Sequence, residues 1–289
     1  MQFRIKGAQR LGGLLVGVFA GLAAVVGAAY AAEPLRIGMV PDAGATLVSV
    51  EEKAPLQKYL EKALGRPVKL IIPTNYNATV EGIGNGSLDI AYFGGLTYVK
   101  AHARYGAIPL VQRDVDRQFQ SLFITREGSG VNSLKNLAGK SFCFGDINST
   151  SGHLYPFLAM KQVGIVPEKT LKSFRYTGSH PATAQAVAAG ACDAGAMDET
   201  VYKSLMADGK ITGAKLKVFY TTPPFADYVW AARKDLAAAD QQAFDNALLK
   251  LQTGRDDQII AILRGTHFVR ADNAEYGNVE RVAKELGLM

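Results

Sequence analysis

Three consecutive hydroxyl side chains, Ser149, Thr150 and Ser151, stand between a predicted strand and a predicted helix. At the start of a helix, unpaired backbone N–H groups and the helix dipole favour an anion. The hydroxyls add neutral hydrogen-bond donors, which suit a protein that must release what it binds. We therefore predict that segment 145–153 binds an anion. The alternative is an ordinary helix cap, for which Asn, Ser and Thr are also the preferred residues.

Gly152 and Pro156 shape the backbone of the same segment. Gly152 has no side chain, so the backbone can approach a ligand closely there. Pro156 lacks the N–H that would bond the carbonyl of Gly152, so we expect the helix predicted from His153 to Val163 to kink or to begin later.

Further polar and aromatic residues follow other predicted strands, where α/β sheets place their ligands. His180 lies between a strand and a helix and is a candidate hydrogen-bond donor from the opposite side of a cleft, although a lone histidine before a proline is more often a solvated or capping residue. Tyr76 ends a strand and offers a hydroxyl, or it is a tyrosine half-buried at a rim. Tyr92 and Phe93 end a third strand, and we count them as weaker candidates.

An enzyme is the main rival from another functional class. Ser149 or Ser151, His180 and Asp198 are the residue types of a hydrolase triad. However, no G-x-S-x-G elbow occurs. We therefore expect no catalytic activity. Neither a C-x-x-C pair, a phosphate loop nor a dinucleotide fingerprint is present, so we also predict no metal and no cofactor.

The first 31 residues have the composition of a secretion signal. Arg4, Lys6 and Arg10 precede the uncharged run Leu11–Ala29, and Ala29-Tyr30-Ala31 is a small-x-small cleavage pattern. We predict a signal peptide over residues 1–31 and a periplasmic location. The alternative is a retained membrane anchor, because the apolar run is about long enough to span a bilayer.

The charged residues and the two cysteines bear on possible partners and on disulfide formation. Removal of the leader takes three of the 32 basic residues, which leaves 29 against 26 acids. No block of Lys and Arg follows, so we expect no nucleic-acid partner. Cys143 and Cys192 either form a disulfide, as the periplasm allows, or remain buried thiols.

Apolar strand patterns alternate with helical ones after the leader, which predicts an α/β fold. The predicted strands are 35–40, 68–72, 88–93, 108–111, 121–125, 141–144, 194–197, 216–220 and 228–232. The predicted helices are 49–64, 79–85, 97–105, 153–163, 183–189, 237–251, 256–263 and 274–286. We expect the strand at 108–111 to complete a parallel core.

This order of elements suits two βα lobes joined by a hinge with two crossings. We place the crossings near Gln120–Phe123 and Tyr220–Pro224. The first lobe then comprises residues 32–121 and 222–289, and the second comprises residues 122–221.

The chain resembles the phosphonate/phosphite/phosphate-binding proteins of ABC importers, which have the type II periplasmic-binding fold. The resemblance is sharpest at Gly145–Gly152, at Asp89–Gly94 and at Thr177–His180. It implies a solute-binding component that closes on a small phosphorus oxyanion and delivers it to a permease in the inner membrane; we expect it to act as a monomer. It also implies that the three hydroxyls of 149–151, together with Tyr76 and His180, hold the phosphoryl oxygens.

Departures from the aminoethylphosphonate binders of this family bear on the ligand. Phe119 stands where such a binder has a tyrosine, and Thr200 stands where it has a glutamate, with Glu199 one residue early. Asp227 lies near the position of a second amine-binding carboxylate, and Asp198 is a weaker candidate. We therefore expect a smaller ligand, namely phosphite, methylphosphonate, phosphate or hypophosphite. A pocket carboxylate that accepts a P–OH proton would disfavour sulfate. The alternatives are aminoethylphosphonate, another small anion, or delivery to a sensor in place of a permease.

Overall fold

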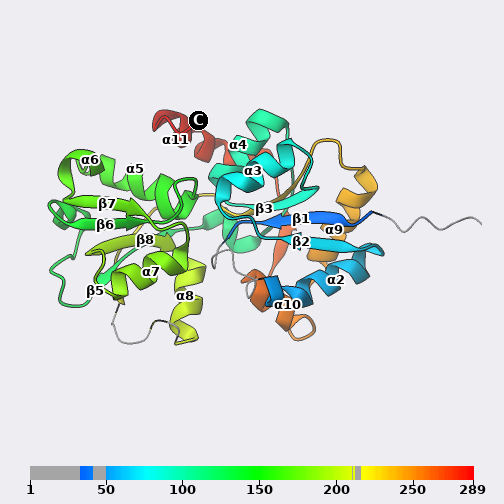
Figure 1. The fold of residues 1–289 in the computed structure, drawn as a ribbon, viewed down its shortest axis with the longest axis horizontal. Helices are drawn as coiled ribbons and strands as arrows, with labels where there is room; N and C mark the ends of the chain where they lie inside the picture. Colours follow the sequence, from blue (N-terminus) through cyan, green and yellow to red (C-terminus); the bar gives the residue numbers. More distant parts are fainter. Residues whose placement is uncertain (1–32, 42–49, 210, 212–215) are drawn as a thin grey trace, which may run out of the picture. The chain divides into compact units, whose positions relative to one another are not determined.

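Two β-sheets organise the chain in the computed structural model, which describes residues 33–41, 50–209, 211 and 216–289 (Figure 1). The predicted signal peptide, residues 1–31, lies outside the described residues. So does the start of the helix predicted from Ser49. None of the helices in the described ranges has both the length and the apolar character that crossing a membrane requires.

The first sheet has six strands among the described residues, in the order β11-β4-β10-β3-β1-β2. Their bounds are β1 Leu35–Met39, β2 Val68–Ile71, β3 Ile90–Phe93, β4 Ile108–Arg113, β10 Val229–Ala232 and β11 Phe268–Arg270. Strands β1, β2 and β3 run parallel. We call this sheet and its helices the first lobe.

Strand β4 does not complete a parallel core, and that prediction was wrong. Strand β10 lies between β3 and β4 and runs antiparallel to both. It reaches this place because the chain returns from the second sheet and enters the first from the opposite direction. The register pairs Val229 with Phe93. The start of β10 therefore lies beside the end of β3.

The second sheet has five strands in the described chain, in the order β7-β6-β8-β5-β9. Their bounds are β5 Ser121–Arg126, β6 Ser141–Phe144, β7 Ser173–Tyr176, β8 Ala194–Asp198 and β9 Leu216–Thr221. Strand β6 is parallel to β7 and β8, whereas β5 is antiparallel to β8 and β9. This sheet and its helices form the second lobe.

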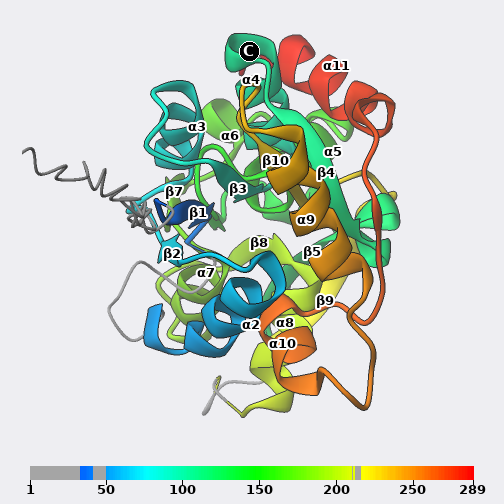
Figure 2. The same ribbon diagram turned by 90° about the vertical axis from the view of Figure 1, so that its right-hand side faces the viewer.

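Helices connect the strands in both lobes (Figures 1 and 2). Those of the first lobe are α2 Ala54–Leu64, α3 Tyr76–Gly84, α4 Gly95–Tyr105, α9 Ala238–Leu249, α10 Asp257–Leu263 and α11 Gly277–Glu285. Those of the second are α5 Tyr155–Gln162, α6 Pro167–Thr170, α7 His180–Ala188 and α8 Glu199–Ala207. Helices α6 and α8 and strand β11 were not predicted from the sequence, and strand β7 was expected before His180 without bounds.

The second sheet is packed on both faces, as the alternation of side chains along a strand requires. Phe142 and Phe144 of β6 belong to one apolar cluster, which includes Met160 of α5. Cys143, between them in sequence, belongs to another cluster with Val187 of α7. Helices α5 and α7 thus cover opposite faces.

Cys143 and Cys192 form a disulfide, with their Cα atoms 5.9 Å apart. Of the two states that the sequence allowed, a disulfide or two buried thiols, the structure has the disulfide. The bond ties β6 to the segment between α7 and β8, in the lobe that carries segment 145–153.

The chain passes between the sheets twice, and the two crossings lie side by side. Phe119 and Phe225 exchange both backbone hydrogen bonds at 2.9 Å. Ser121 then pairs with Thr222, whose hydroxyl accepts the N–H of Ser121 at 2.9 Å. The crossings therefore form a short two-stranded link, from which a hinge motion can arise.

Candidate functional site

Most of the predicted ligand-binding residues lie where strands end and helices begin in both lobes. Asp227 instead precedes strand β10, and Tyr76, which was expected to end a strand, begins helix α3. Each of the main candidates is at most 1 % exposed: Tyr76, Ser149, Thr150, Ser151, His180 and Asp227. Among the weaker candidates, Phe93 and Asp198 are fully buried, Tyr92 is 3 % exposed and Glu199 is 8 % exposed. Polar groups buried to this degree need partners, because an unpaired buried group costs free energy.

Segment 145–154 closes on itself before α5 begins. The hydroxyl of Ser149 accepts the N–H of Gly152 at 2.9 Å, and residues 150–154 form a π-helical turn. The carbonyl of Gly152, which Pro156 cannot bond, instead accepts the N–H of Gly145 at 2.9 Å. The α-helix starts at Tyr155, so the expected late start is confirmed.

Gly152 has no room for a side chain. A Cβ atom there would lie 3.0 Å from the Cα of Gly145 and 3.1 Å from the Cε1 of His180. It would also lie 2.9 Å from the Oγ of Ser149. The hydroxyl segment and His180 therefore form one continuous wall on the second lobe.

Two residues from different lobes satisfy the first N–H groups of α4. The carboxylate of Asp227 accepts the N–H of Gly95 at 2.9 Å, and the hydroxyl of Thr150 accepts that of Leu96 at 3.0 Å. The register of β10 against β3 explains the position of Asp227, which precedes the strand pair Val229–Phe93. Thr150 comes from the second lobe, so this contact joins the lobes at the site.

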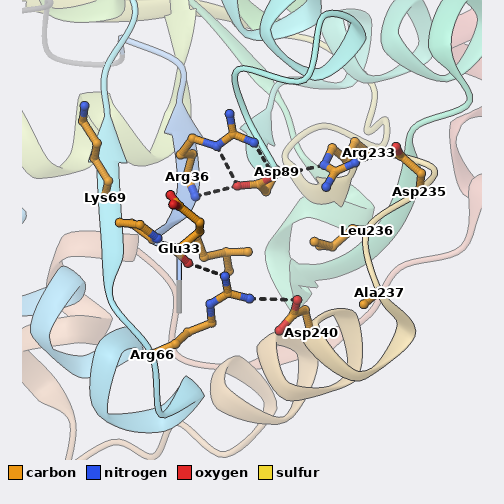
Figure 3. Close-up of a pocket in the computed structure, with 12 residues that line it drawn as sticks. Glu33, Arg36, Arg66, Lys69, Asp89, Arg233, Asp235, Leu236, Ala237 and Asp240 are labelled. Atoms are coloured by element: carbon orange, nitrogen blue, oxygen red, sulfur yellow. Dashed lines mark hydrogen bonds and ion pairs between the residues drawn. The ribbon is translucent and has the colours of Figure 1, made fainter. Parts of the chain in front are cut away.

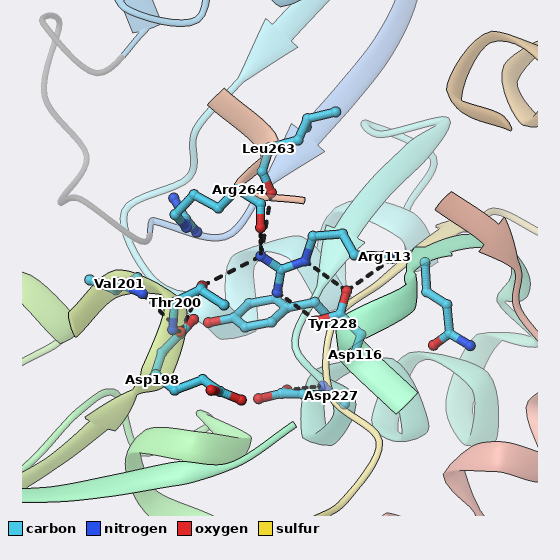
Figure 4. Close-up of polar contacts among 12 residues, drawn as sticks. Arg113, Asp116, Asp198, Thr200, Val201, Asp227, Tyr228, Leu263 and Arg264 are labelled. Atoms are coloured by element: carbon cyan, nitrogen blue, oxygen red, sulfur yellow. Dashed lines mark hydrogen bonds and ion pairs between the residues drawn. The ribbon is translucent and has the colours of Figure 1, made fainter. Parts of the chain in front are cut away.

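Of the buried side-chain oxygens that have no hydrogen-bond partner among the described residues, three belong to serine or aspartate candidates at the junction of the lobes. They are Ser151 Oγ, Asp198 Oδ2 and Asp227 Oδ2. The carboxyl groups of Asp198 and Asp227 point toward one another in Figure 4. Such atoms at the junction of two lobes indicate a place that a polar ligand completes.

Asp227 holds a proton more tightly than an ordinary aspartate. Burial raises its pKa to about 7, with the charges of Asp198 and Asp116 adding to the effect against the hydrogen bonds from Gly95 and Thr150. Near neutral pH this carboxyl can therefore either accept or donate a hydrogen bond.

Asp198 caps helix α8 and orients His180. Its Oδ1 accepts the N–H groups of Thr200 and Val201, and its own N–H donates to Nδ1 of His180 at 3.2 Å. The Nε2 of His180 lies 3.1 Å from the hydroxyl of Tyr228. Burial opposes the charge of Asp198, but its proximity to His180 and the charges of Arg264 and Arg113 lower its pKa overall.

Aromatic residues pack against one another next to Asp227, on the side of the first lobe. Tyr92 stacks on Tyr228 with ring centroids 5.1 Å apart, and Trp230 lies 4.8 Å from Tyr92. Phe119 meets the edge of Tyr228 at 5.6 Å. Tyr228 was missed because segment 228–232 was considered only as a strand.

The carboxylate of Glu199 does not join those of Asp198 and Asp227. Its Oε1 accepts the backbone N–H of Gln120 at 3.2 Å, and its Oε2 accepts Lys203 at 2.6 Å. It therefore supports the first crossing between the lobes.

A pocket of about 640 Å³ lies at the amino ends of β1 and β2 (Figure 3). Several of its charged side chains pair with one another. Asp89 accepts from Arg36 at 2.7 and 2.9 Å and from Arg233 at 3.0 Å, and Arg66 donates to Asp240 at 3.0 Å. None of the candidate residues lines it. Within the described ranges, no group of three or more His, Cys, Asp or Glu residues is arranged to hold a metal ion.

Comparison with known proteins gives a coherent result. Residues 37–276 match a family model described as the periplasmic substrate-binding protein of phosphonate ABC transporters. A probable phosphite-binding protein of an ABC transporter, PhnD1 of Prochlorococcus marinus, is 31 % identical over 87 % of this chain and 89 % of its own length. The phosphate-import protein PhnD of Mycolicibacterium smegmatis is 34 % identical over 63 % of this chain and 61 % of its own.

Solved structures of similar proteins agree with this family assignment. The structure of the Prochlorococcus PhnD1 in complex with methylphosphonate has a TM-score of 0.82, with 31 % identity, 88 % of this chain covered and 98 % of the other. The aliphatic sulphonate binding protein SsuA of Escherichia coli, at 17 % identity and a TM-score of 0.59 over 89 % of this chain and 92 % of its own, shares the fold. The predicted two-lobed periplasmic-binding fold is confirmed.

Proposed function

The chain belongs to the periplasmic phosphonate-binding proteins of ABC transporters, and we propose that its site captures a compact phosphorus oxyanion that carries a P–OH proton. It is the substrate-binding component of such a transporter. Phosphite and methylphosphonate are the foremost ligands, because one relative, PhnD1 of Prochlorococcus marinus, is described as a probable phosphite-binding protein and its structure is a complex with methylphosphonate. Phosphate follows, whereas hypophosphite, whose anion has P–H bonds and no P–OH proton, fits the proposal less well.

The observation that carries this proposal is the trio of unpartnered buried oxygens, Ser151 Oγ, Asp198 Oδ2 and Asp227 Oδ2. A hydroxyl can donate to an anionic oxygen, whereas a carboxylate can only accept. A fully deprotonated oxyanion would therefore meet repulsion at the aspartates. An anion with one P–OH group can accept a hydrogen bond from the hydroxyl and donate one to a carboxylate. Because the pKa of Asp227 is about 7, a proton can be shared between its carboxylate and the ligand.

In the proposed complex, Ser149, Thr150 and Ser151 hold phosphoryl oxygens, joined by the hydroxyl of Tyr76. His180, whose ring nitrogens contact Asp198 and Tyr228, lies beside them. Neutral donors make strong hydrogen bonds to an anion in a dry site, yet add no net charge that would retain the ligand. Phe119, Tyr92 and Tyr228, whose rings pack on one another, would supply aromatic surface beside the ligand. That surface suits a P–H or P–CH₃ group.

Aminoethylphosphonate is the second candidate, and the two free aspartate oxygens favour it specifically. An ammonium group between Asp198 and Asp227 would satisfy both. Against it, the site has Phe119 in place of a further hydroxyl donor, and Glu199 is bound to Gln120 and Lys203.

A hydrolase has less support from the same contacts. Both ring nitrogens of His180 have partners other than serine, namely the N–H of Asp198 and the hydroxyl of Tyr228. The hydroxyl of Ser149 accepts a backbone N–H. We propose that the protein binds and does not catalyse.

Capture proceeds by hinge closure. We propose that residues 32–121 and 222–289 move as one body and residues 122–221 as the other, about the paired crossings at Phe119 and Phe225. The closed monomer then docks on an inner-membrane permease, after cleavage of the predicted signal peptide over residues 1–31. Delivery to a sensor remains the alternative, and transport assays in cells lacking the permease separate the two.

A melting-shift panel tests the ligand class. Phosphite, methylphosphonate, phosphate, hypophosphite, aminoethylphosphonate and sulfate are compared in parallel. A ligand at 100 times its dissociation constant should stabilise the protein by about 2.7 kcal/mol. Absence of any shift with every phosphorus compound would overturn the proposal.

A further inference from the structure

Arg113 is a fully buried cation outside the proposed ligand shell. It ends β4 and is 1 % exposed. Its Nε and Nη2 donate to the two carboxylate oxygens of Asp116 at 2.8 and 2.5 Å. Since arginine stays charged in proteins, this bidentate pair anchors a permanent positive charge in the first lobe.

The end of helix α10 is shaped around this guanidinium. Nη1 of Arg113 donates to the carbonyl oxygens of Leu263 and Arg264 at 3.3 and 3.2 Å. Arg264 has a φ of 53°, a conformation that side chains disfavour. A Cβ at Gly265 would lie 2.7 Å from Cγ and Cδ of Arg113. The left-handed conformation of Arg264 and the absence of a side chain at Gly265 thus both make room for the side chain of Arg113.

The same guanidinium reaches the second lobe. Its Nη1 lies 3.5 Å from the hydroxyl of Thr200, which donates to Oδ1 of Asp198 at 2.8 Å. This leaves Oδ2 of Asp198 as the oxygen without a partner among the described residues. Figure 4 shows Arg113 between the end of α10 and Thr200, with Asp198 and Asp227 below.

A second route links Arg113 to the same aspartate. Its guanidinium carbon lies 5.1 Å from the ring centroid of Tyr228, within cation–π range. The hydroxyl of Tyr228 contacts Nε2 of His180, and Nδ1 of His180 accepts the N–H of Asp198. The contacts therefore form a closed circuit through Arg113, Thr200, Asp198, His180 and Tyr228. It crosses between the lobes twice, at Arg113–Thr200 and at His180–Tyr228.

We propose that Arg113 is a positioning residue that couples lobe closure to the orientation of the ligand-binding groups. The circuit is complete only when the lobes meet. It then fixes Asp198 with one oxygen toward the ligand and fixes the ring orientation of His180. This inference extends the proposed function, since the oriented groups are those expected to touch the anion.

A double-mutant cycle on Arg113 and Thr200 tests the coupling. Thr200→Val removes the hydroxyl and keeps the side-chain shape, and Arg113→Lys keeps the charge but loses the planar fork. Calorimetric titration with methylphosphonate should show about tenfold weaker binding for each single variant. The double variant should lose little more than either one, because both break one circuit.

Two controls separate positioning from a loss of stability. Thr200→Ser restores the hydroxyl and should bind within about twofold of the wild type. Thr125→Val removes another buried threonine hydroxyl of the second lobe, which bonds the carbonyl of Asp193 at 2.6 Å. It should lower the melting temperature without changing affinity. Wild-type affinity in Thr200→Val, or fully multiplicative effects in the double variant, would overturn the proposal.

A ligand-free measurement keeps this test independent of the proposed ligand. Spin labels at the exposed residues Lys62 and Lys172 report the separation of the lobes. Thr200→Val should shift the unliganded protein toward longer separations, and Thr125→Val should not. If the wild type binds no methylphosphonate, the ligand proposal fails, and this distance comparison alone decides the role of the circuit. Identical distance distributions in Thr200→Val and wild type would contradict it.

Discussion

Thr150 and Asp227 bind neighbouring N–H groups at the start of α4, although they come from different lobes. The distances are 3.0 Å to the nitrogen of Leu96 and 2.9 Å to that of Gly95. Gly94 makes this possible, because a Cβ there would lie 3.2 Å from Oγ1 of Thr150 and 3.4 Å from Oδ1 of Asp227. The helix end thereby holds one group of each lobe beside the proposed ligand.

Loss of the hydroxyl at Ser149 or Thr150 should weaken ligand binding. Ser149→Ala removes a donor to the anion, and Thr150→Ala removes a hydroxyl that can donate either to Asp227 or to the anion. Each change should cost about 1.5–3 kcal/mol, the range for hydrogen bonds to charged groups. Titration calorimetry with methylphosphonate measures this. Thr150→Ser keeps the hydroxyl and is the matched control. Unchanged affinity in both alanine variants would remove these residues from the site.

Asp227 should make the ligand-free protein less stable as pH rises. Its folded pKa of about 7 exceeds the ordinary 3.8. Between these values the native state binds more protons than the unfolded chain, so the unfolding free energy falls by at most about 1.4 kcal/mol per pH unit. Asp227→Asn lacks this titration. The stability difference between variant and wild type should shift in favour of the variant from pH 4 to pH 7 and then level off.

Urea unfolding at each pH gives this comparison. Asp114→Asn alters an exposed aspartate near the same crossing and serves as the control. Parallel stability curves for wild type and Asp227→Asn across that range would mean that Asp227 titrates as an ordinary acid.

Gly152→Ala should damage the site and the fold together. Its Cβ would press on the backbone of Gly145 at 3.0 Å and on His180 at 3.1 Å. We expect a loss of about 1–3 kcal/mol, typical of overpacking, with weaker ligand binding. Gly277→Ala meets no atom within 4 Å and should be neutral or stabilising. Equal melting temperatures for the two variants would contradict the close packing at Gly152.

The disulfide should support stability more than binding. Cys143 and Cys192 are 49 residues apart, for which loop-closure entropy gives about 4 kcal/mol. The double serine variant should unfold at lower urea concentration yet still bind methylphosphonate, because neither cysteine contacts the candidate residues by any hydrogen bond described above. Affinity that fell in step with stability would contradict this separation.

Local sequence patterns predicted most strands and the hydroxyl segment because both depend on neighbouring residues. The late start of α5 followed from Pro156 alone. The parallel arrangement of β4 failed because strand order depends on where the returning chain inserts β10. Helix α8 was missed, although Asp198 is a residue type that favours the start of a helix. In the structure its side chain accepts the N–H groups of Thr200 and Val201.

Residues that act at a distance in sequence were harder to find. Arg113 comes just after the apolar residues of a predicted strand, and charged residues are ordinary at the ends of strands. Its sequence position therefore gave no reason to single it out. Its partners Asp116, Arg264 and Thr200 meet only in the fold. Asp227 was a candidate by resemblance, whereas its contact with Gly95 depends on the antiparallel register of β10.

Competition between methylphosphonate and sulfate tests the central claim most directly. The two anions are similar in size and tetrahedral, but only methylphosphonate carries an acidic proton near neutral pH. Calorimetric titration of the wild-type protein with each should give binding of methylphosphonate and none of sulfate, with a heat that depends on the buffer when Asp227 changes its protonation. Sulfate that bound as tightly as methylphosphonate would contradict a site built for a protonated phosphorus oxyanion.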